Sequence, residues 1–188
     1  MKKVELLRQL LATSPFLAFR QTEFTKIRLR YRSKYNIYSR FGYQWSDAQN
    51  KGRKSLSIGL RNRLRQLFDE AIEDFPESKH KLNYASLRAE AGKPILHKIV
   101  FDILSSDLLF FDVTHPNANV FFELGIAYAA STNLFLLRNE SGTWRLPSDL
   151  AGLTYIDYRL DTELHMNSSS ENDIKRIMRK SIRQKMKD

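Results

Sequence analysis

Residues 108–130 read LLFFDVTHPNANVFFELGIAYAA, and the rest of the chain can be interpreted outward from this segment. A strand is expected over 107–113, ending at Asp112, because a continuous apolar run is typical of a central parallel strand covered on both faces. A polar turn follows at 114–119, and a helix is expected over 120–130. A buried strand that leads through a short turn into an apolar helix is typical of α/β proteins.

Strands and helices are predicted to alternate on both sides of this segment. Strands are expected at 35–39, 82–87, 134–137 and 154–158, and helices at 57–75, 95–104 and from a capping box of Ser168 and Glu171 onward. This alternation predicts an α/β fold with a doubly wound parallel sheet and flanking helices. Residues 2–12 have helical spacing, so we expect residues 1–25 to form an N-terminal helical appendage to one domain over 26–188.

The composition excludes several classes of chemistry. The chain of 188 residues is 42% hydrophobic and 28% charged, which suits a globular domain with its own core. It has no cysteine, which excludes disulfides, cysteine-bound zinc and thiol nucleophiles. The four histidines are not in metal-ligand spacing, so no metal site is expected. No apolar run is long enough for a membrane span, and we expect a cytoplasmic protein that does not bind membranes.

The net charge of +10 is distributed unevenly along the chain. Residues 1–65 carry a net charge of +13, residues 66–165 carry −7, and residues 166–188 carry +4. In the basic stretch 26–65, arginines and lysines alternate with aromatic residues, a pattern that nucleic-acid-binding surfaces share. A solvated surface that keeps the protein soluble explains the same charge, so both interpretations stay open.

Two acidic residues are predicted to lie at one edge of the sheet. Asp112 ends a strand, and Glu123 lies in the first or second turn of the next helix. In doubly wound sheets, ligands bind at the carboxyl ends of strands, next to the amino ends of the following helices. Carboxylates are rarely placed in apolar surroundings without a partner or a function. Alternatively, Glu123 could only complement the helix dipole, and Asp112 could be a turn former.

The sequence resembles the TIR-like and nucleoside 2-deoxyribosyltransferase-like domains. The resemblance rests on Asp112-Val113-Thr114, on PNANVFFELGIAYA at 116–129, and on LPSDLAGL with TYIDY at 146–158. It implies a flavodoxin-like fold and a nucleoside or nicotinamide dinucleotide as ligand. Many members cleave an N-glycosidic bond at the ribose C1′, with a glutamate at the position of Glu123 as the catalytic residue.

Glu123 suits this chemistry because bond cleavage creates positive charge at C1′, which a carboxylate stabilises or attacks. Asp112 would then bind ribose hydroxyls or orient the substrate. Asn117 and Asn119 could hydrogen-bond ribose or phosphate, although either could instead cap the helix. Arg40 is expected to follow the first strand and could contact a pyrophosphate.

The aromatic residues Tyr38 and Phe41 could stack on a base, or they could belong to the core or to an interface. No Gly-x-Gly-x-x-Gly motif is present, so NAD is expected as a substrate and not as a bound cofactor.

The leading hypothesis is an NAD glycohydrolase or cyclase that acts as a bacterial defence or toxin effector. Its expected partners are a nucleotide substrate and either further copies of itself or an activating protein. A nucleoside 2-deoxyribosyltransferase-like enzyme or a nucleotide N-glycosidase is the second hypothesis. The third is a non-catalytic module that senses nucleotides or binds nucleic acid through residues 26–65.

Overall fold

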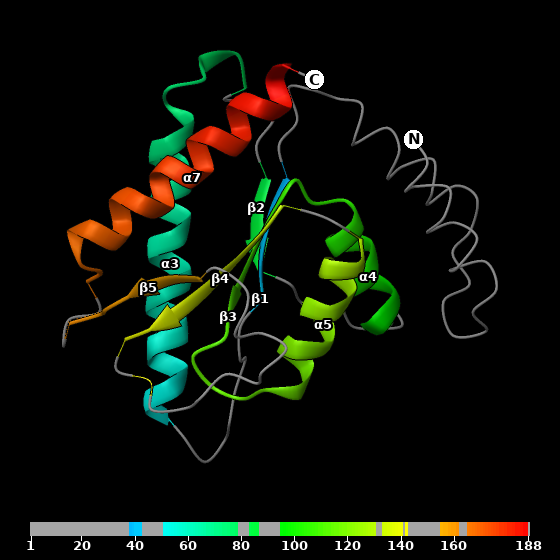
Figure 1. Ribbon diagram of the computed structural model, residues 1–188, viewed down its shortest axis with the longest axis vertical. Helices are drawn as coiled ribbons and strands as arrows, with labels where there is room; N and C mark the ends of the chain where they lie inside the picture. The colour runs from blue at the N-terminus through cyan, green and yellow to red at the C-terminus, as the bar shows by residue number, and fades with distance from the viewer. Residues whose placement is uncertain are drawn as a thin grey trace.

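Five parallel strands form the centre of the protein. The structure is a computed structural model that describes residues 38–42, 51–78, 83–86, 95–130, 133–140, 142, 155–161 and 165–187. The strands are β1 (Tyr38–Gly42), β2 (Asn83–Ser86), β3 (Leu108–Asp112), β4 (Leu134–Asn139) and β5 (Tyr155–Tyr158), in the spatial order β2-β1-β3-β4-β5 (Figure 1). This order is that of the flavodoxin-like fold, so the predicted fold class is confirmed.

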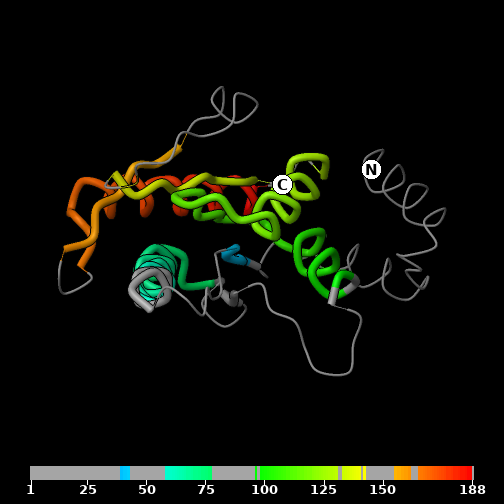
Figure 2. The backbone as a smooth tube through the Cα atoms, turned by 90° about the horizontal axis from the view of Figure 1, so that it is seen from below, coloured from blue at the N-terminus to red at the C-terminus, as the bar shows by residue number. Residues whose placement is uncertain are grey.

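Two layers of helices cover the sheet. The helices α3 (Lys51–Ile72) and α7 (Ser168–Lys187) pack on one face. The helices α4 (Ile95–Leu104) and α5 (Ala118–Ala129) lie on the other face (Figure 1). Figure 2 shows the same arrangement from below, with α4 and α5 next to each other and far from α3. A short 3-10 helix, Pro76–Ser78, follows α3.

The central strand β3 is buried on both faces, as its apolar sequence predicts. Leu108 and Phe110 belong to the hydrophobic cluster with α3 and α7, whereas Leu109 and Phe111 belong to the cluster with α5. All four side chains are fully buried. The strand therefore joins the two halves of the core.

The order of the strands reverses between β1 and β3. The chain runs from β1 through α3 to β2 at the sheet's edge, then through α4 back past β1 to β3, and on through α5 to β4. Because such crossovers are right-handed, the reversal places α3 and the pair α4 and α5 on opposite faces. In such sheets, ligands bind at this switch point, next to the carboxyl ends of the two strands, here β1 and β3.

The helix α3 confirms the predicted apolar stripe but has different ends. It runs from Lys51 to Ile72 instead of 57–75, and the predicted inward residues are all buried: Leu60, Leu64, Leu67, Phe68, Ala71, Ile72 and Phe75. Phe75 is buried although it lies beyond the helix.

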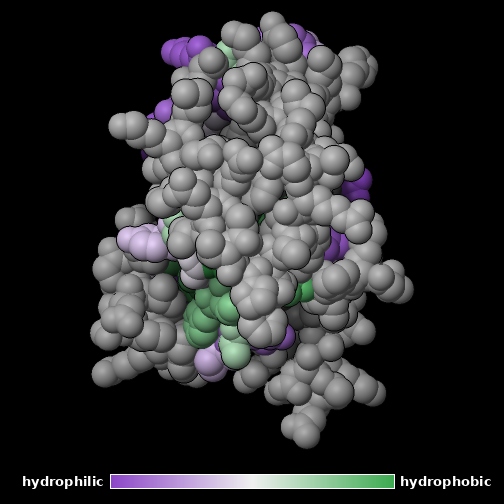
Figure 3. Space-filling model, turned by 90° about the vertical axis from the view of Figure 1, so that its right-hand side faces the viewer, coloured by the Kyte–Doolittle hydropathy of each residue, from purple (hydrophilic) through white to green (hydrophobic). Residues whose placement is uncertain are grey.

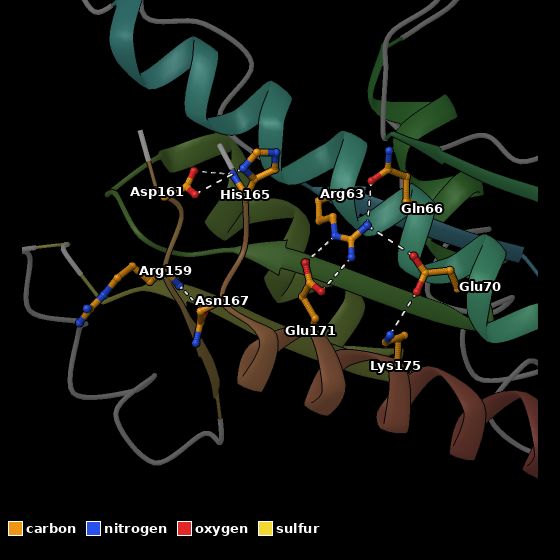
Figure 4. Close-up of polar contacts among 9 residues, drawn as sticks. All are labelled: Arg63, Gln66, Glu70, Arg159, Asp161, His165, Asn167, Glu171 and Lys175. Atoms are coloured by element: carbon orange, nitrogen blue, oxygen red, sulfur yellow. Dashed lines mark hydrogen bonds and ion pairs between the residues drawn. The ribbon is translucent and has the colours of Figure 1, made fainter. Parts of the chain in front are cut away.

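Ion pairs join α7 to α3 (Figure 4). The guanidinium of Arg63 donates to both carboxylate oxygens of Glu171, at 2.6 and 2.8 Å. Glu70 accepts from Arg63 at 3.4 Å and from Lys175 at 3.1 Å. Beneath these pairs, α7 buries Ser170, Ile174, Met178 and Ile182. The first and last described helices therefore form one unit.

The predicted capping box of Ser168 and Glu171 is wrong. The helix begins at Ser168, and the backbone carbonyl of Asn167 accepts the Glu171 N–H at 3.2 Å. Arg63 on α3 binds the Glu171 carboxylate, and this charge-assisted bidentate contact is stronger than a neutral capping bond.

The remaining predicted elements are found at or near their expected positions. The helix predicted at 95–104 is α4, and the strands predicted at 82–87, 134–137 and 154–158 are β2, β4 and β5. The first strand, expected at 35–39, is described from Tyr38 to Gly42. The predicted appendage at 1–25 lies outside the described residues. In the part of the chain that is described, none of the helices has the length and apolar character needed to cross a membrane.

Candidate functional site

The carboxyl ends of β1 and β3 meet at one edge of the sheet. Gly42, the last residue of β1, pairs with Phe111, the next-to-last residue of β3. Glu123 lies in the second turn of α5, the helix that follows β3. Glu123 therefore lies at the point where the strand order reverses.

The carboxylate of Glu123 lies against the backbone of Gly42. A Cβ atom at position 42 would be 3.2 Å from Glu123 Oε2 and only 2.5 Å from Cδ1 of the Phe111 ring. Any side chain at position 42 would therefore displace the buried ring or the carboxylate. Glycine allows β1, β3 and α5 to approach closely at this edge.

Burial alone changes the acidity of Glu123. Desolvation raises the pKa of Glu123 to about 7. Among the described residues, neither a hydrogen bond nor an ion pair holds its carboxylate. A partly buried carboxylate that lacks a described protein partner is suited to stabilise a positive charge on a ligand.

In contrast, the carboxylate of Asp112 is bound by the protein itself. Its Oδ1 atom accepts the backbone N–H of Thr114 at 3.0 Å and the Thr114 hydroxyl at 2.5 Å. Its Oδ2 atom accepts the Tyr158 hydroxyl at 3.4 Å. Desolvation raises the pKa of Asp112, and the hydrogen bonds from Thr114 oppose this shift.

Asn117 is the N-cap of α5. It has an extended backbone, and its Oδ1 atom accepts the N–H groups of Asn119 at 3.0 Å and of Val120 at 3.1 Å. Of the two expected caps, the structure selects Asn117. Asn119 lies in the first turn of the helix and is exposed to solvent.

The sequence predicts that Arg40 follows the first strand. In the structure, Arg40 lies in the middle of that strand, β1. It is buried, and its Nη2 atom lies 3.7 Å from Asp102 Oδ1 on α4. Lys98 donates to the other oxygen of Asp102 at 2.6 Å. The guanidinium is thus directed toward α4. The prediction failed because the strand continues to Gly42, two residues beyond Arg40.

The two aromatic candidates also belong to β1. Phe41 is fully buried in the cluster with α3 and α7, so it is a core residue and its ring does not face the edge. Tyr38 begins the strand, and its side chain lies outside the described part. Residues 26–37 and 43–50 of the basic stretch 26–65 also lie outside the described residues.

Sequence reasoning missed Gly42, Thr114 and Tyr158. Tyr158 is the last residue of β5, and Thr114 follows β3 by two residues, so both lie near carboxyl ends of strands. A polar residue at the end of an apolar strand is the signal that could have identified them.

Two aromatic rings on α5 are exposed to solvent. Phe122 is 54% exposed and Tyr128 is 62% exposed, both on α5. Figure 3 views the side of the molecule that carries α4 and α5, and hydrophobic atoms are visible there. Within the described ranges, no group of three or more acidic or histidine side chains is arranged to hold a metal ion.

Comparison with known proteins identifies the family. No curated protein matches the chain. Residues 60–160, which include β3, α5 and Glu123, match the family described as the TIR domain of CAP12/Pycsar effector proteins. This match covers more than half of the 188 residues, and it agrees with the order of the strands. The chain therefore belongs to the TIR-domain family of CAP12/Pycsar effectors.

Proposed function

We propose that the protein cleaves the N-glycosidic bond of a nucleotide, that its substrate is NAD, and that it acts as an effector in bacterial defence. The observation that carries this proposal is the carboxylate of Glu123, which lies at the switch point of the sheet and lacks a described protein partner. The family match supports an effector role.

The reaction needs few protein groups. The bond between C1′ of the ribose and the pyridinium nitrogen breaks, and nicotinamide leaves as a neutral molecule with the bonding electrons. No general acid is needed for this leaving group. The positive charge that develops at C1′ is stabilised by the ionised carboxylate of Glu123. Water then adds to C1′ and releases a proton, or an adenine nitrogen of the same molecule attacks and gives a cyclic product.

The amino end of α5 could hold an anionic part of the substrate. The helix begins at Ala118, and the positive end of its dipole favours negative charge. Asn117 already satisfies the N–H groups of Asn119 and Val120, so the phosphates of the substrate would bind next to this cap and not in place of it. Asn119, which is exposed beside the cap, could contact ribose or phosphate.

Release of nicotinamide from NAD tests the proposal. Wild-type protein is incubated with NAD over a range of protein concentrations, because self-association or an activating partner is expected, and products are separated by liquid chromatography. We expect Glu123→Gln to lower the rate by about a hundredfold to a thousandfold, since it removes a charge that faces the transition state.

Glu73→Gln is the matched control, because Glu73 is an exposed residue directly after α3 and no described contact links it to the site. It should react like wild type. The proposal is refuted if no nicotinamide appears at any protein concentration, or if Glu123→Gln and wild type react equally fast. Mass spectrometry of other nucleosides and nucleotides in the same mixture would then show whether a different N-glycosidic bond is cleaved.

A further inference from the structure

A buried polar cluster lies beside the site on the side away from Gly42. It consists of Asp112, Thr114, Asn139 and Tyr158, from the ends of β3, β4 and β5 and from the connection between β3 and α5. Three of these residues, all except Asp112, are less than 9% exposed. Such clusters are costly unless every group is satisfied, so their hydrogen bonds fix geometry.

The direction of each hydrogen bond follows from the donors that are available. The backbone N–H of Asn139 can only donate, and it lies 2.8 Å from Thr114 Oγ1. The hydroxyl of Thr114 is therefore an acceptor toward β4, and its single proton points to Asp112 Oδ1 at 2.5 Å. The Thr114 side chain thus connects β4 to the end of β3.

Tyr158 completes the cluster from β5. Its hydroxyl lies 3.4 Å from Asp112 Oδ2 and 3.4 Å from Thr114 Oγ1. Burial, together with the nearby charge of Asp112, raises the pKa of Tyr158 well above its ordinary value. The phenol therefore keeps its proton and serves as a donor. Both oxygens of Asp112 then accept protein donors.

The position of Thr114 is also fixed by packing. A Cβ atom at Gly142 would lie 3.1 Å from the carbonyl oxygen of Asn139 and 3.2 Å from Thr114 Cγ2. The backbone at Gly142 therefore closes over Thr114. In addition, the N–H of Val113 donates to the carbonyl of Leu137 at 2.9 Å, which attaches the same connection to β4.

We propose that Asp112, Thr114 and Tyr158 act as positioning residues, which fix the connection between β3 and α5 and thereby hold Glu123 against Gly42. Asp112 acts through Thr114 and does not contact the sugar. This inference rests on the proposed function, because Glu123 is the group that is positioned. It assigns to Asp112 a role different from the ribose binding that the family resemblance implies.

The substitution Thr114→Val tests this inference. It keeps the shape of the side chain but removes the acceptor for Asn139 and the donor for Asp112. We expect kcat for nicotinamide release to fall between about tenfold and a hundredfold, because small displacements of a reacting group are costly. We expect KM for NAD to change less than twofold. Thr114→Ser restores the hydroxyl and should restore kcat.

Tyr158→Phe is the milder variant, since it removes one hydroxyl from a buried ring. We expect it to lower kcat less than Thr114→Val and to leave KM unchanged. Asp112→Asn separates positioning from substrate binding: an increase of KM by tenfold or more with unchanged kcat would show that Asp112 contacts the substrate, and would overturn the inference.

A second measurement does not depend on enzymatic activity. The titration of the Glu123 carboxyl carbon is followed by NMR in wild type, Thr114→Val and Thr114→Ser. We expect the pKa of Glu123, about 7 in the wild type, to fall in Thr114→Val and to be restored in Thr114→Ser. An unchanged titration in a folded Thr114→Val protein overturns the inference. If the titration responds as expected but no variant, including wild type, releases nicotinamide, the positioning role holds and the proposed function fails.

Discussion

At the scale of single residues, the ionisation of Glu123 links the fold to the proposed activity. Its carboxylate must be charged to stabilise positive charge at C1′, yet burial raises the pKa of Glu123 to about 7. We therefore expect kcat/KM for nicotinamide release to rise about tenfold per pH unit below pH 7 and to become constant above it. A pH profile from 5 to 9 measures this. A profile that is flat across pH 7 would contradict the assignment.

The same pKa predicts how stability depends on pH. The folded protein binds the Glu123 proton more tightly than the unfolded chain does, so the stability that Glu123 contributes is fully present below about pH 4.5 and is lost as pH rises to about 7. Glu123→Gln does not titrate, so at pH 8 it should be more stable than wild type by on the order of 2 kcal/mol.

Urea unfolding at pH 4 and pH 8 measures this difference. Glu73→Gln, the same chemical change at an exposed position directly after α3, should show no comparable change between the two pH values. A difference between Glu123→Gln and wild type that is the same at both pH values would show that the Glu123 carboxyl is not desolvated.

Gly42 is predicted to tolerate no side chain. In Gly42→Ala, the new Cβ atom would overlap the ring of Phe111, which is fully buried and cannot move away without disturbing β3. Overpacking of this kind costs about 1–3 kcal/mol. We expect thermal unfolding at a lower temperature and a loss of nicotinamide release, since Glu123 would also be displaced. Wild-type stability in Gly42→Ala would show that the edge is more open than described.

The position of Glu123 at the sheet edge could be predicted from the sequence, but the contacts around Asp112 and Thr114 could not. Glu123 stands in an apolar helix, and this local pattern makes it a candidate without knowledge of the fold. Thr114 contacts residues that lie 25 and 44 positions further along the chain. These contacts depend on the spatial order of β3, β4 and β5, which no local pattern contains.

At the scale of helices and strands, the cap of α5 gives a separate test. Asn117→Ala removes the acceptor for the N–H groups of Asn119 and Val120 and should cost about 1 kcal/mol of stability. Asn117→Asp keeps the acceptor and should be nearly neutral. Chemical denaturation of both variants measures the effect. If Asn117→Ala is as stable as wild type, the cap does not stabilise the protein, and substrate binding is then the remaining reason for an asparagine at this position.

The sequence predicts the ends of strongly apolar helices and strands well, but it does not predict the ends of elements whose terminal residues are polar. The helix α4 and the strand β3 are found at or within a residue of their predicted ends, because their apolar residues continue to those ends. The first turn of α3 is polar and gives no periodic signal, so the helix begins six residues before its predicted start. Glu171 has the spacing of a capping residue, but Arg63, 108 residues away in the sequence, binds its carboxylate.

At the scale of the whole molecule, the core depends on α7. Met178 is fully buried between α7 and α3, in the cluster that also contains Phe110 of the central strand. Met178→Ala should therefore destabilise the entire domain by about 2–5 kcal/mol, in one cooperative transition. Circular dichroism and intrinsic fluorescence should give the same unfolding midpoint. Separate midpoints would show that α7 detaches on its own.

The contact between α3 and α7 also has a consequence for synthesis. Arg63 and Glu171 are 108 positions apart, so a ribosome translates all five described strands before the partner of Arg63 exists. Until then, one face of the sheet lacks half of its cover, and contacts between such distant segments form slowly. A growing chain that already contains Glu123 consequently remains without a complete core, so the proposed activity would reach the cell only once translation has passed α7.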